Sequence, residues 1–354
     1  MKVMADNVLA GETGSILEKI RRVSQRIGKD VSIMEVCGTH TQTIARYGIK
    51  SLLPENVKIV SGPGCPVCVT PQKIVDISVR LALEGKPVAT YGDMLKVPGT
   101  EMSLEGARSE GADVFVVEST VDALRMKKDY KDIIFLAIGF ETTTPMTAYA
   151  VKKGLDIICA HKTIPEAMVA IADDSDNKID GFLNPGHVSA ITGVDAYECV
   201  KAPQVISGFE PEDVLVSVFM LLSQIENGLA LVENQYGRVV KKEGNPVALE
   251  LTDSVFKKCD AEWRGLGIIA QSGLILNKKY MKYDAEKKYA DILDNLPVPK
   301  MNPECRCAEV IMGKIEPCEC PLFSRLCNPD MPVGPCMVGS ESSCRIAYKY
   351  REAV

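Results

Sequence analysis

The feature that most constrains this chain is the regular alternation of short β-branched runs with helical patterns across its first two-thirds. Val31 to Val36 is one such run and Val57 to Val60 is another, and each is followed by apolar residues at helical spacing. Alternation of this kind is typical of α/β architecture with mainly parallel sheets. We therefore expect strands at these runs and at residues 88–91, 114–117, 133–138, 156–160, 179–183 and 205–207.

The length and internal similarity of the chain suggest its domain organisation. The 354 residues exceed the roughly 100–200 that one domain usually holds. Because its two alternating parts look alike, we predict similar α/β domains at residues 1–128 and 129–238, with a long buried helix at 212–232. Residues 239–354 would form a connector and a small C-terminal domain dense in Cys, Pro and Gly. Such a segment needs a staple such as a metal, because it has little apolar periodicity.

Composition and charge exclude several functional classes. Acidic residues outnumber basic ones by 47 to 41, whereas a general nucleic-acid binder would show a basic face. The longest apolar runs fall well short of the roughly 20 residues that a bilayer span requires. The first fifteen residues contain no apolar stretch typical of a secretory signal. We therefore expect a cytoplasmic protein with no nucleic-acid partner and no membrane partner.

The thirteen cysteines are unusual, and their distribution is uneven. Cys37, Cys65 and Cys68 lie near the start, and seven more crowd between Cys305 and Cys344. In a long chain without an export signal, many cysteines indicate metal ligation or redox chemistry rather than a disulfide framework.

Five polar, glycine-containing motifs directly follow expected strands. The carboxyl ends of strands line the ligand crevice of an open α/β sheet, so motifs from both halves suggest a shared cleft. The plainer alternative is that they are ordinary turns, since Gly and Pro punctuate turns everywhere. The motifs are CGTHT at 37–41, GPGCPVC at 62–68, GFETT at 139–143, NPGHVS at 184–189 and GFEP at 208–211.

The thiols near the start allow several interpretations. Cys65 and Cys68 have CxxC spacing at a strand-to-helix junction, where backbone N–H groups and the helix dipole favour a thiolate. They could be a redox dithiol, half of a zinc site or a structural loop. Cys37 and His40 could resemble a nucleophile and its base, although a pair three residues apart is weak evidence. Three thiols at one edge would also suit iron or copper(I).

The C-terminal cysteines form the strongest compositional signal. Four thiolates among them could hold a 4Fe-4S cluster, although the spacing matches neither bacterial nor plant-type ferredoxins. A zinc ribbon is the alternative, but its usual CxxC knuckles are missing. The seven residues are Cys305, Cys307, Cys318, Cys320, Cys327, Cys336 and Cys344.

Taken together, these motifs resemble the HypD family, which contains maturation factors for the iron–cyanide–carbonyl group of nickel–iron hydrogenases. The resemblance covers nearly the whole chain. Its further motifs are LLPENVKIVSGPGCPVCVTP at 52–71, YGDMLKVPG at 91–99, EWRGLG at 262–267 and CPLFSRLCNPDMPVGPCMV at 320–338.

The resemblance implies a site for each group of cysteines. The family's cluster spacing selects Cys305, Cys320, Cys327 and Cys344, separated by fourteen, six and sixteen residues, as 4Fe-4S ligands. Cys307, Cys318 and Cys336 are then left over. The resemblance further assigns Cys37 as the thiolate that holds iron at the contact with the small chaperone HypC, with His40 beside that iron. Cys65 and Cys68 would form a dithiol or disulfide that exchanges electrons with the cluster.

We therefore expect a scaffold and redox partner rather than a turnover enzyme. Iron would carry cyanide and CO ligands, and cyanide would come from a thiocyanate on HypE. Candidates for binding in the cleft are Thr39, Glu141, Thr142, His187 and Glu210. The alternatives are an iron–sulfur thiol-disulfide oxidoreductase, resembling thioredoxin-reducing enzymes, and a zinc-stapled binding module.

Two departures from the family pattern are visible. Lys96 stands where arginine is usual, which matters only if that position grips an anion through two hydrogen bonds. Residues 339–343 read GSESS instead of a more usual SSEGA, so the turn before Cys344 could differ.

Overall fold

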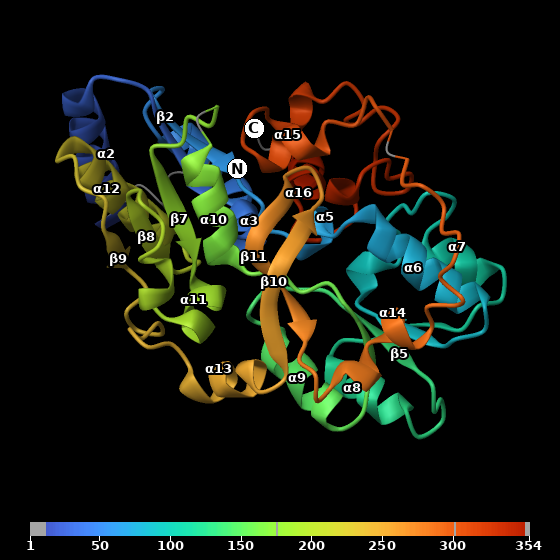
Figure 1. Ribbon diagram of the computed structural model, residues 1–354. Coiled ribbons are helices and arrows are strands. Elements are labelled where there is room, and N and C mark those ends of the chain that lie inside the picture. Colours follow the sequence, from blue (N-terminus) through green and yellow to red (C-terminus); the bar gives the residue numbers. More distant parts are fainter. Residues whose placement is uncertain (1–11, 175, 301, 351–354) are drawn as a thin grey trace.

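The computed structural model describes residues 12–174, 176–300 and 302–350. It contains two parallel sheets, one antiparallel hairpin and a cysteine-rich C-terminal region (Figure 1). The expected α/β fold class is therefore confirmed. Within the described ranges, no helix is long and apolar enough to cross a membrane.

Sheet A carries the first two strands of the chain together with three much later ones. Its order is β2-β1-β7-β8-β9, and every neighbouring pair is parallel. Residue Ile33 of β1 lies between Ile59 and Gly181, so β1 is an interior strand. The strands are β1 (Val31–Glu35), β2 (Val57–Ser61), β7 (Gly181–Pro185), β8 (Gln204–Ser207) and β9 (Val232–Asn234).

Two long helices cover one face of sheet A, and its other face belongs to a second core. Helices α2 (Glu12–Ile27) and α12 (Pro211–Glu226) pack against each other, and their apolar side chains form a core with Ile33 and Ile59. Met34 points to the opposite core, as the alternation of side chains along a strand requires. Helix α12 ends at Glu226, before the expected residue 232, because Gly228 turns the chain with a φ of 64°.

Sheet B is built from the four strands between the two parts of sheet A. Its order is β4-β3-β5-β6, again fully parallel. Helices α6 (Gln72–Leu83) and α7 (Leu104–Ser109) share one core with it, while α8 (Thr120–Met126) and α9 (Thr144–Lys152) share the other. The strands are β3 (Val88–Thr90), β4 (Val114–Val116), β5 (Ile134–Ala137) and β6 (Asp156–Cys159).

The pairing of strands does not follow the domain boundary expected at residue 128. That position lies between β4 and β5, which both belong to sheet B. The chain instead leaves sheet A after β2 and returns to it at β7. Sequence similarity between successive βα units cannot reveal this, because it carries no information on which strands pair.

The glycine-rich stretch at 265–273 belongs to a hairpin. Strands β10 (Phe256–Trp263) and β11 (Gly267–Leu276) pair antiparallel and pack on α10 (Ile164–Asp173). At the tip, Gly265 has a φ of 85°, and a Cβ there would lie 2.7 Å from the Cβ of Ala308. The tip therefore rests directly against the C-terminal region.

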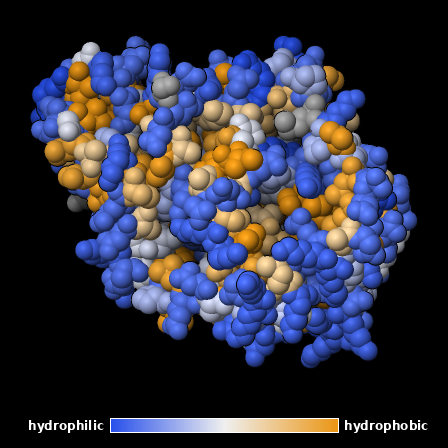
Figure 2. All heavy atoms as spheres, in the orientation of Figure 1, coloured by the Kyte–Doolittle hydropathy of each residue, from blue (hydrophilic) through white to orange (hydrophobic). Residues whose placement is uncertain are grey.

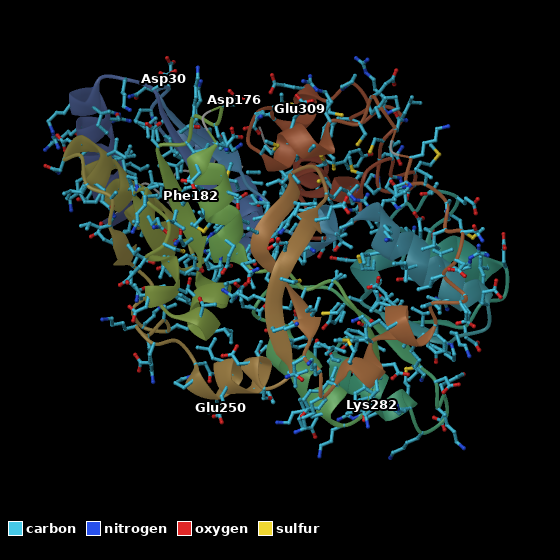
Figure 3. All side chains as sticks on the ribbon, viewed as in Figure 1. Asp30, Asp176, Phe182, Glu250, Lys282 and Glu309 are labelled. Carbon is cyan, nitrogen blue, oxygen red and sulfur yellow. The ribbon has the colours of Figure 1, made fainter. Side chains whose placement is uncertain are left out.

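The C-terminal region is held together by short elements. Helix α16 (Ser343–Tyr350) packs on α3 (Gly38–Arg46), while α15 (Cys307–Ile311) meets the hairpin tip. Figure 3 shows yellow sulfur atoms gathered in this region, to the right of Glu309. The remaining elements are α4 (Ile49–Leu52), α5 (Pro66–Val69), η1 (Gly92–Met94), α11 (Gly186–Thr192), η2 (Asp195–Tyr197), α13 (Pro246–Asp253), η3 (Met281–Tyr283), α14 (Ala285–Lys288), η4 (Pro317–Glu319) and η5 (Pro335–Met337).

The surface seen in this orientation is mixed. Figure 2 shows hydrophilic side chains along most of the rim, with apolar ones toward the centre and over α2 and α12 on the left. Scattered apolar side chains are normal for a folded protein.

Candidate functional site

Cys37 lies at the carboxyl end of β1 and caps the start of α3. Its backbone is extended, with φ of −153° and ψ of 121°. The buried carboxylate of Glu35 accepts hydrogen bonds from the backbone N of Cys37 at 2.9 Å and from Oγ1 of Thr41 at 2.5 Å. Burial raises the pKa of Glu35 to about 8. Burial, helped by the charges of Glu341 and Glu35, raises the pKa of Cys37 to about 12.

The loop of Cys37 touches the loop that carries the CxxC pair. The backbone N of Gly38 donates to the O of Gly64 at 3.4 Å. A Cβ on Gly64 would lie 2.3 Å from the backbone N of Cys37, so only glycine fits there. This contact follows from the parallel pairing of β1 and β2, whose carboxyl ends open at the same edge of sheet A.

Cys65 and Cys68 form a close thiol pair on the short helix α5. Cys65 caps its first turn, and the Sγ of Cys65 lies 3.0 Å from the Oγ of Ser342. Burial opposes ionisation of Cys68, but hydrogen bonds from the thiols of Cys336 and Cys65 outweigh it and lower its pKa to about 6. The hydrogen bond with Cys68, together with burial, raises the pKa of Cys65. Cys68 is thus the more acidic member of the pair.

Cys307 and Cys336, which the family's cluster spacing leaves over, lie beside Cys68. The thiol of Cys336, on η5, is within hydrogen-bonding reach of Cys68, Cys307 and Cys344. Cys307 in turn contacts Cys305. The only sequence signal for this arrangement is the CxC spacing of Cys305 and Cys307, which does not indicate a spatial partner. All thirteen cysteines are free thiols in this structure.

The four expected cluster ligands lie in one compact segment. Cys305 interacts electrostatically with Cys320, and Cys344 interacts with Cys327. A Cβ on Gly334 would lie 2.7 Å from the Sγ of Cys305, so a larger residue there would clash with that sulfur. Among the described residues, no three His, Cys, Asp or Glu side chains converge as ligands of a single ion. In a 4Fe-4S cluster each thiolate binds a different iron, so this donor set of four thiols still fits such a cluster.

A C-terminal loop, residues 339–343, closes over the three amino-terminal thiols. Thr39 donates from Oγ1 to Oε1 of Glu341 at 2.8 Å. The backbone N and Oγ of Ser340 both donate to Asp93, at 2.9 Å each. Together with the contact between Cys65 and Ser342, these bonds attach the loop to the segments that follow β1, β2 and β3. Thr39, a candidate binding residue, therefore holds this loop.

The rings of His40 and His187 both pack against the ring of Phe209. The ring of Phe209 is 3.9 Å from that of His187 and 4.9 Å from that of His40, centre to centre. Nε2 of His40 lies 2.9 Å from the O of Gly208, and burial lowers the pKa of His40 to about 4. The buried His40 is thus neutral, whereas His187 is exposed and electrostatically linked to Glu341.

The other candidates have structural neighbours rather than contacts with the thiols. Glu210 caps α12, where it shares a capping box with Asp213. Thr142 is exposed on the turn after β5. Oε1 of the buried Glu141 accepts from the backbone N of Ile164 at 3.0 Å and so caps α10, and burial raises the pKa of Glu141 to about 7.

Comparisons with known proteins agree on one family. A family model described as "HypD: Hydrogenase formation hypA family" matches residues 12–351. The hydrogenase maturation factor HypD of Escherichia coli (strain K12) is 40% identical over 353 residues, covering 95% of this chain and 93% of its own length. The protein of the same name from Rhodobacter capsulatus is also 40% identical, over 357 residues, with 95% and 94% covered.

Proposed function

Because the chain belongs to the HypD family of hydrogenase maturation factors, we propose that it is a scaffold and redox partner for assembly of an iron–dicyanide–carbonyl group. The observation that carries this proposal is the convergence of thiols from distant parts of the chain. Cys37 lies on a loop that touches the loop of Cys65 and Cys68, and Cys68 contacts Cys336 of the C-terminal region.

In this proposal the iron is cargo, and Cys37 is its anchor. The second thiolate would come from HypC. Thiolates suit this task because they donate electron density to an iron that binds π-accepting ligands. Glu35 fixes the backbone of Cys37, and the neutral His40 lies on the adjoining helix α3. Both would act by orienting the anchor.

The pair Cys65 and Cys68 would supply the two electrons that cyanide release requires. A thiocyanate on HypE must lose its sulfur–carbon bond. Two thiols are oxidised to one disulfide, the sulfur of HypE takes one proton, and cyanide leaves with the other. Cys68 suits the first step because its lowered pKa of about 6 gives a thiolate near neutral pH.

The residues that would hold the 4Fe-4S cluster are Cys305, Cys320, Cys327 and Cys344. When bound, such a cluster supplies or accepts one electron at a time. The chain's own contribution is the row of sulfurs that runs from Cys344 through Cys336 to Cys68. Because these sulfurs are buried and adjacent, electrons would cross only short distances from which water is excluded.

A second candidate function is a thiol-disulfide oxidoreductase. The acidic Cys68 beside Cys65 favours it, because reactive dithiols commonly contain one thiol of lowered pKa. This function would need neither HypC nor Cys37.

Infrared spectroscopy of the complex with HypC, purified anaerobically, separates the two functions. We expect Cys37→Ala to abolish the cyanide and CO bands while the brown cluster absorbance persists. Cys199→Ala is the matched control, because Cys199 is an exposed thiol whose Sγ donates to the O of Ala196. Undiminished bands in Cys37→Ala would show that Cys37 is not the iron anchor. No cyanide or CO bands in the unchanged complex would refute the assembly role and favour the oxidoreductase.

A further inference from the structure

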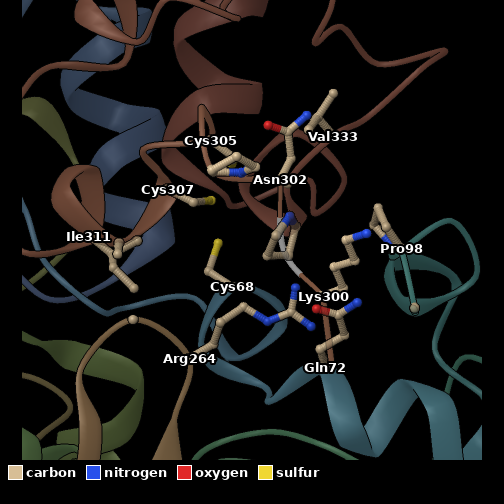
Figure 4. A pocket seen from close by; sticks show the side chains of 16 residues that line it. Cys68, Gln72, Pro98, Arg264, Lys300, Asn302, Cys305, Cys307, Ile311 and Val333 are labelled. Atoms are coloured by element: carbon tan, nitrogen blue, oxygen red, sulfur yellow. The ribbon is translucent and has the colours of Figure 1, made fainter. Parts of the chain in front are cut away.

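A cavity of about 420 Å³ opens beside the redox thiols. It lies between the start of α6, the hairpin tip and the C-terminal region (Figure 4). Figure 4 shows the sulfurs of Cys68 and Cys307 facing each other across it, with the guanidinium of Arg264 beneath them. The lining residues that matter here are Cys68, Gln72, Arg264, Lys300, Cys305 and Cys307.

Arg264 is a buried cation with an unfilled bonding position. Its side chain is part of a residue only 8% exposed, and its Nε donates to the O of Thr70 at 2.8 Å. Its backbone N donates to the O of Val69 at 2.9 Å. Within the described residues its Nη2 has no hydrogen-bond partner. A buried guanidinium nitrogen normally has one, so Nη2 can donate to an acceptor that enters the cavity.

Among the residues that the structure describes, no carboxylate fills this position. The charge partners of Arg264 are the thiols of Cys307, Cys336 and Cys68 and, more weakly, the carboxylate of Asp76. The oxygens of Asp76 accept from the N and Oγ1 of Thr100 at 2.6 and 2.7 Å. Lys300, exposed at the rim, adds a second positive charge. The cavity is therefore suited to a small anion.

Of the four expected cluster ligands, Cys305 lines the cavity, and Cys320, Cys327 and Cys344 do not. The cavity therefore borders the expected cluster site on one side only. A ligand in the cavity would reach Cys68. Arg264 holds the loop of Cys68 in place through its hydrogen bonds to the carbonyl oxygens of residues 69 and 70.

We propose that the cavity admits a small thiol that carries a carboxylate, and that this thiol reduces the pair Cys65 and Cys68. The inference rests on the proposed redox function of that pair. The carboxylate would bind Arg264 and Lys300, which places the ligand's sulfur next to Cys68.

The chemistry balances with two molecules of thiol. The ligand's thiolate attacks the Sγ of Cys68 in the disulfide, and the bond between Cys65 and Cys68 breaks. Cys65 leaves as a thiolate and takes a proton. A second thiol attacks the ligand's sulfur, and Cys68 is released as a thiol. Two ligand thiols become one ligand disulfide, so two electrons and two protons pass to the chain.

The test compares thiols of different charge on the oxidised full-length protein. Mercaptosuccinate is anionic, 2-mercaptoethanol is neutral and cysteamine is cationic. At equal thiolate concentration and low salt, we expect mercaptosuccinate to reduce the pair about fivefold faster than cysteamine, since a local charge of this kind is worth a modest Coulomb energy. Alkylation followed by mass spectrometry reports Cys65 and Cys68 directly. Succinate, which has no thiol, should slow the anionic reaction by competition.

The variants identify the cation responsible. Arg264→Gln should remove the preference for the anionic thiol, and Lys300→Gln, at the exposed rim, should weaken it without affecting folding. Arg125→Gln is the matched control, because Arg125 is an exposed arginine paired with Asp122 and should keep the full preference.

Two results would overturn the inference. One is equal rates with all three thiols in the native chain. The other is a preference that survives in both Arg264→Gln and Lys300→Gln. The measurement needs neither iron nor HypC, so it is independent of the infrared test. A charge preference without infrared bands would refute the assembly role and leave the cavity's assignment intact.

Discussion

Replacing Gly64 by alanine tests the contact that brings Cys37 to the CxxC pair. The new Cβ would lie 2.3 Å from both the N of Cys37 and the C of Val36, and 2.7 Å from the Cα of Cys37. These are backbone atoms of an interior strand end, so they cannot rotate aside. Overpacking of this kind costs about 1–3 kcal/mol. We therefore expect the thermal midpoint to fall by about 3–10 °C.

Thermal unfolding of the anaerobically purified protein provides the measurement, and Gly237→Ala provides the control. The nearest atom to a Cβ on Gly237 is 4.0 Å away, so that variant should stay within about 0.5 kcal/mol of the parent. Separation of the two loops in Gly64→Ala should also speed alkylation of Cys37 and Cys65. If Gly64→Ala has the same thermal midpoint as Gly237→Ala, and its thiols are alkylated no faster than those of the parent, the two loops do not touch as described.

Two further predictions concern Glu141, which caps α10, and Gly265 at the hairpin tip. Glu141 has a pKa of about 7 instead of its ordinary 4.5, so the folded chain keeps a proton that the unfolded chain releases, and stability should fall between these pH values. The free energy of unfolding of the parent should therefore drop by up to about 3 kcal/mol between pH 5 and pH 8, measured by urea unfolding, and that of Glu141→Gln should not. The same pH profile in parent and variant would contradict the raised pKa. Gly265→Ala should displace α15 from the hairpin and make residues after 302 more sensitive to protease. Gly267→Ala is the control, because Gly267 also has a positive φ, of 78°, but a Cβ there meets nothing within 4 Å. Equal sensitivity in both variants would rule out the steric contact with Ala308.

The α/β architecture could be predicted because it depends on local patterns. Strands β1, β2 and β5 are short β-branched runs between helices, and the structure places them within a residue or two of the expected bounds. The hairpin was missed because its alternation is interrupted. Its register shifts between Cys259 and Ala261, and Gln271 adopts a φ of 53°. Such irregularities remove the periodicity of two that identifies a strand.

The candidate site was predictable only in part. The position of Cys37 and Cys65 just after two strands follows from the strand pattern. The parallel pairing of those two strands is seen only in the structure. The approach of Cys336 to Cys68 does not follow from the strand pattern either, because it depends on how a segment of little regular structure folds back over the sheets. Arg264 was missed as well. Its importance lies in an unfilled hydrogen bond, and sequence does not show which bonds are filled.

The late return of the chain to sheet A has a consequence for synthesis on the ribosome. The interior strand β1 needs β7 as a neighbour, yet every residue between Ser61 and Gly181 must be translated first. Sheet B is complete by Cys159 and can form earlier as a unit. Until β7 emerges, the nascent chain would display Cys37, Cys65 and Cys68 without their final surroundings. We therefore expect these thiols to be most vulnerable to oxidation before translation has finished.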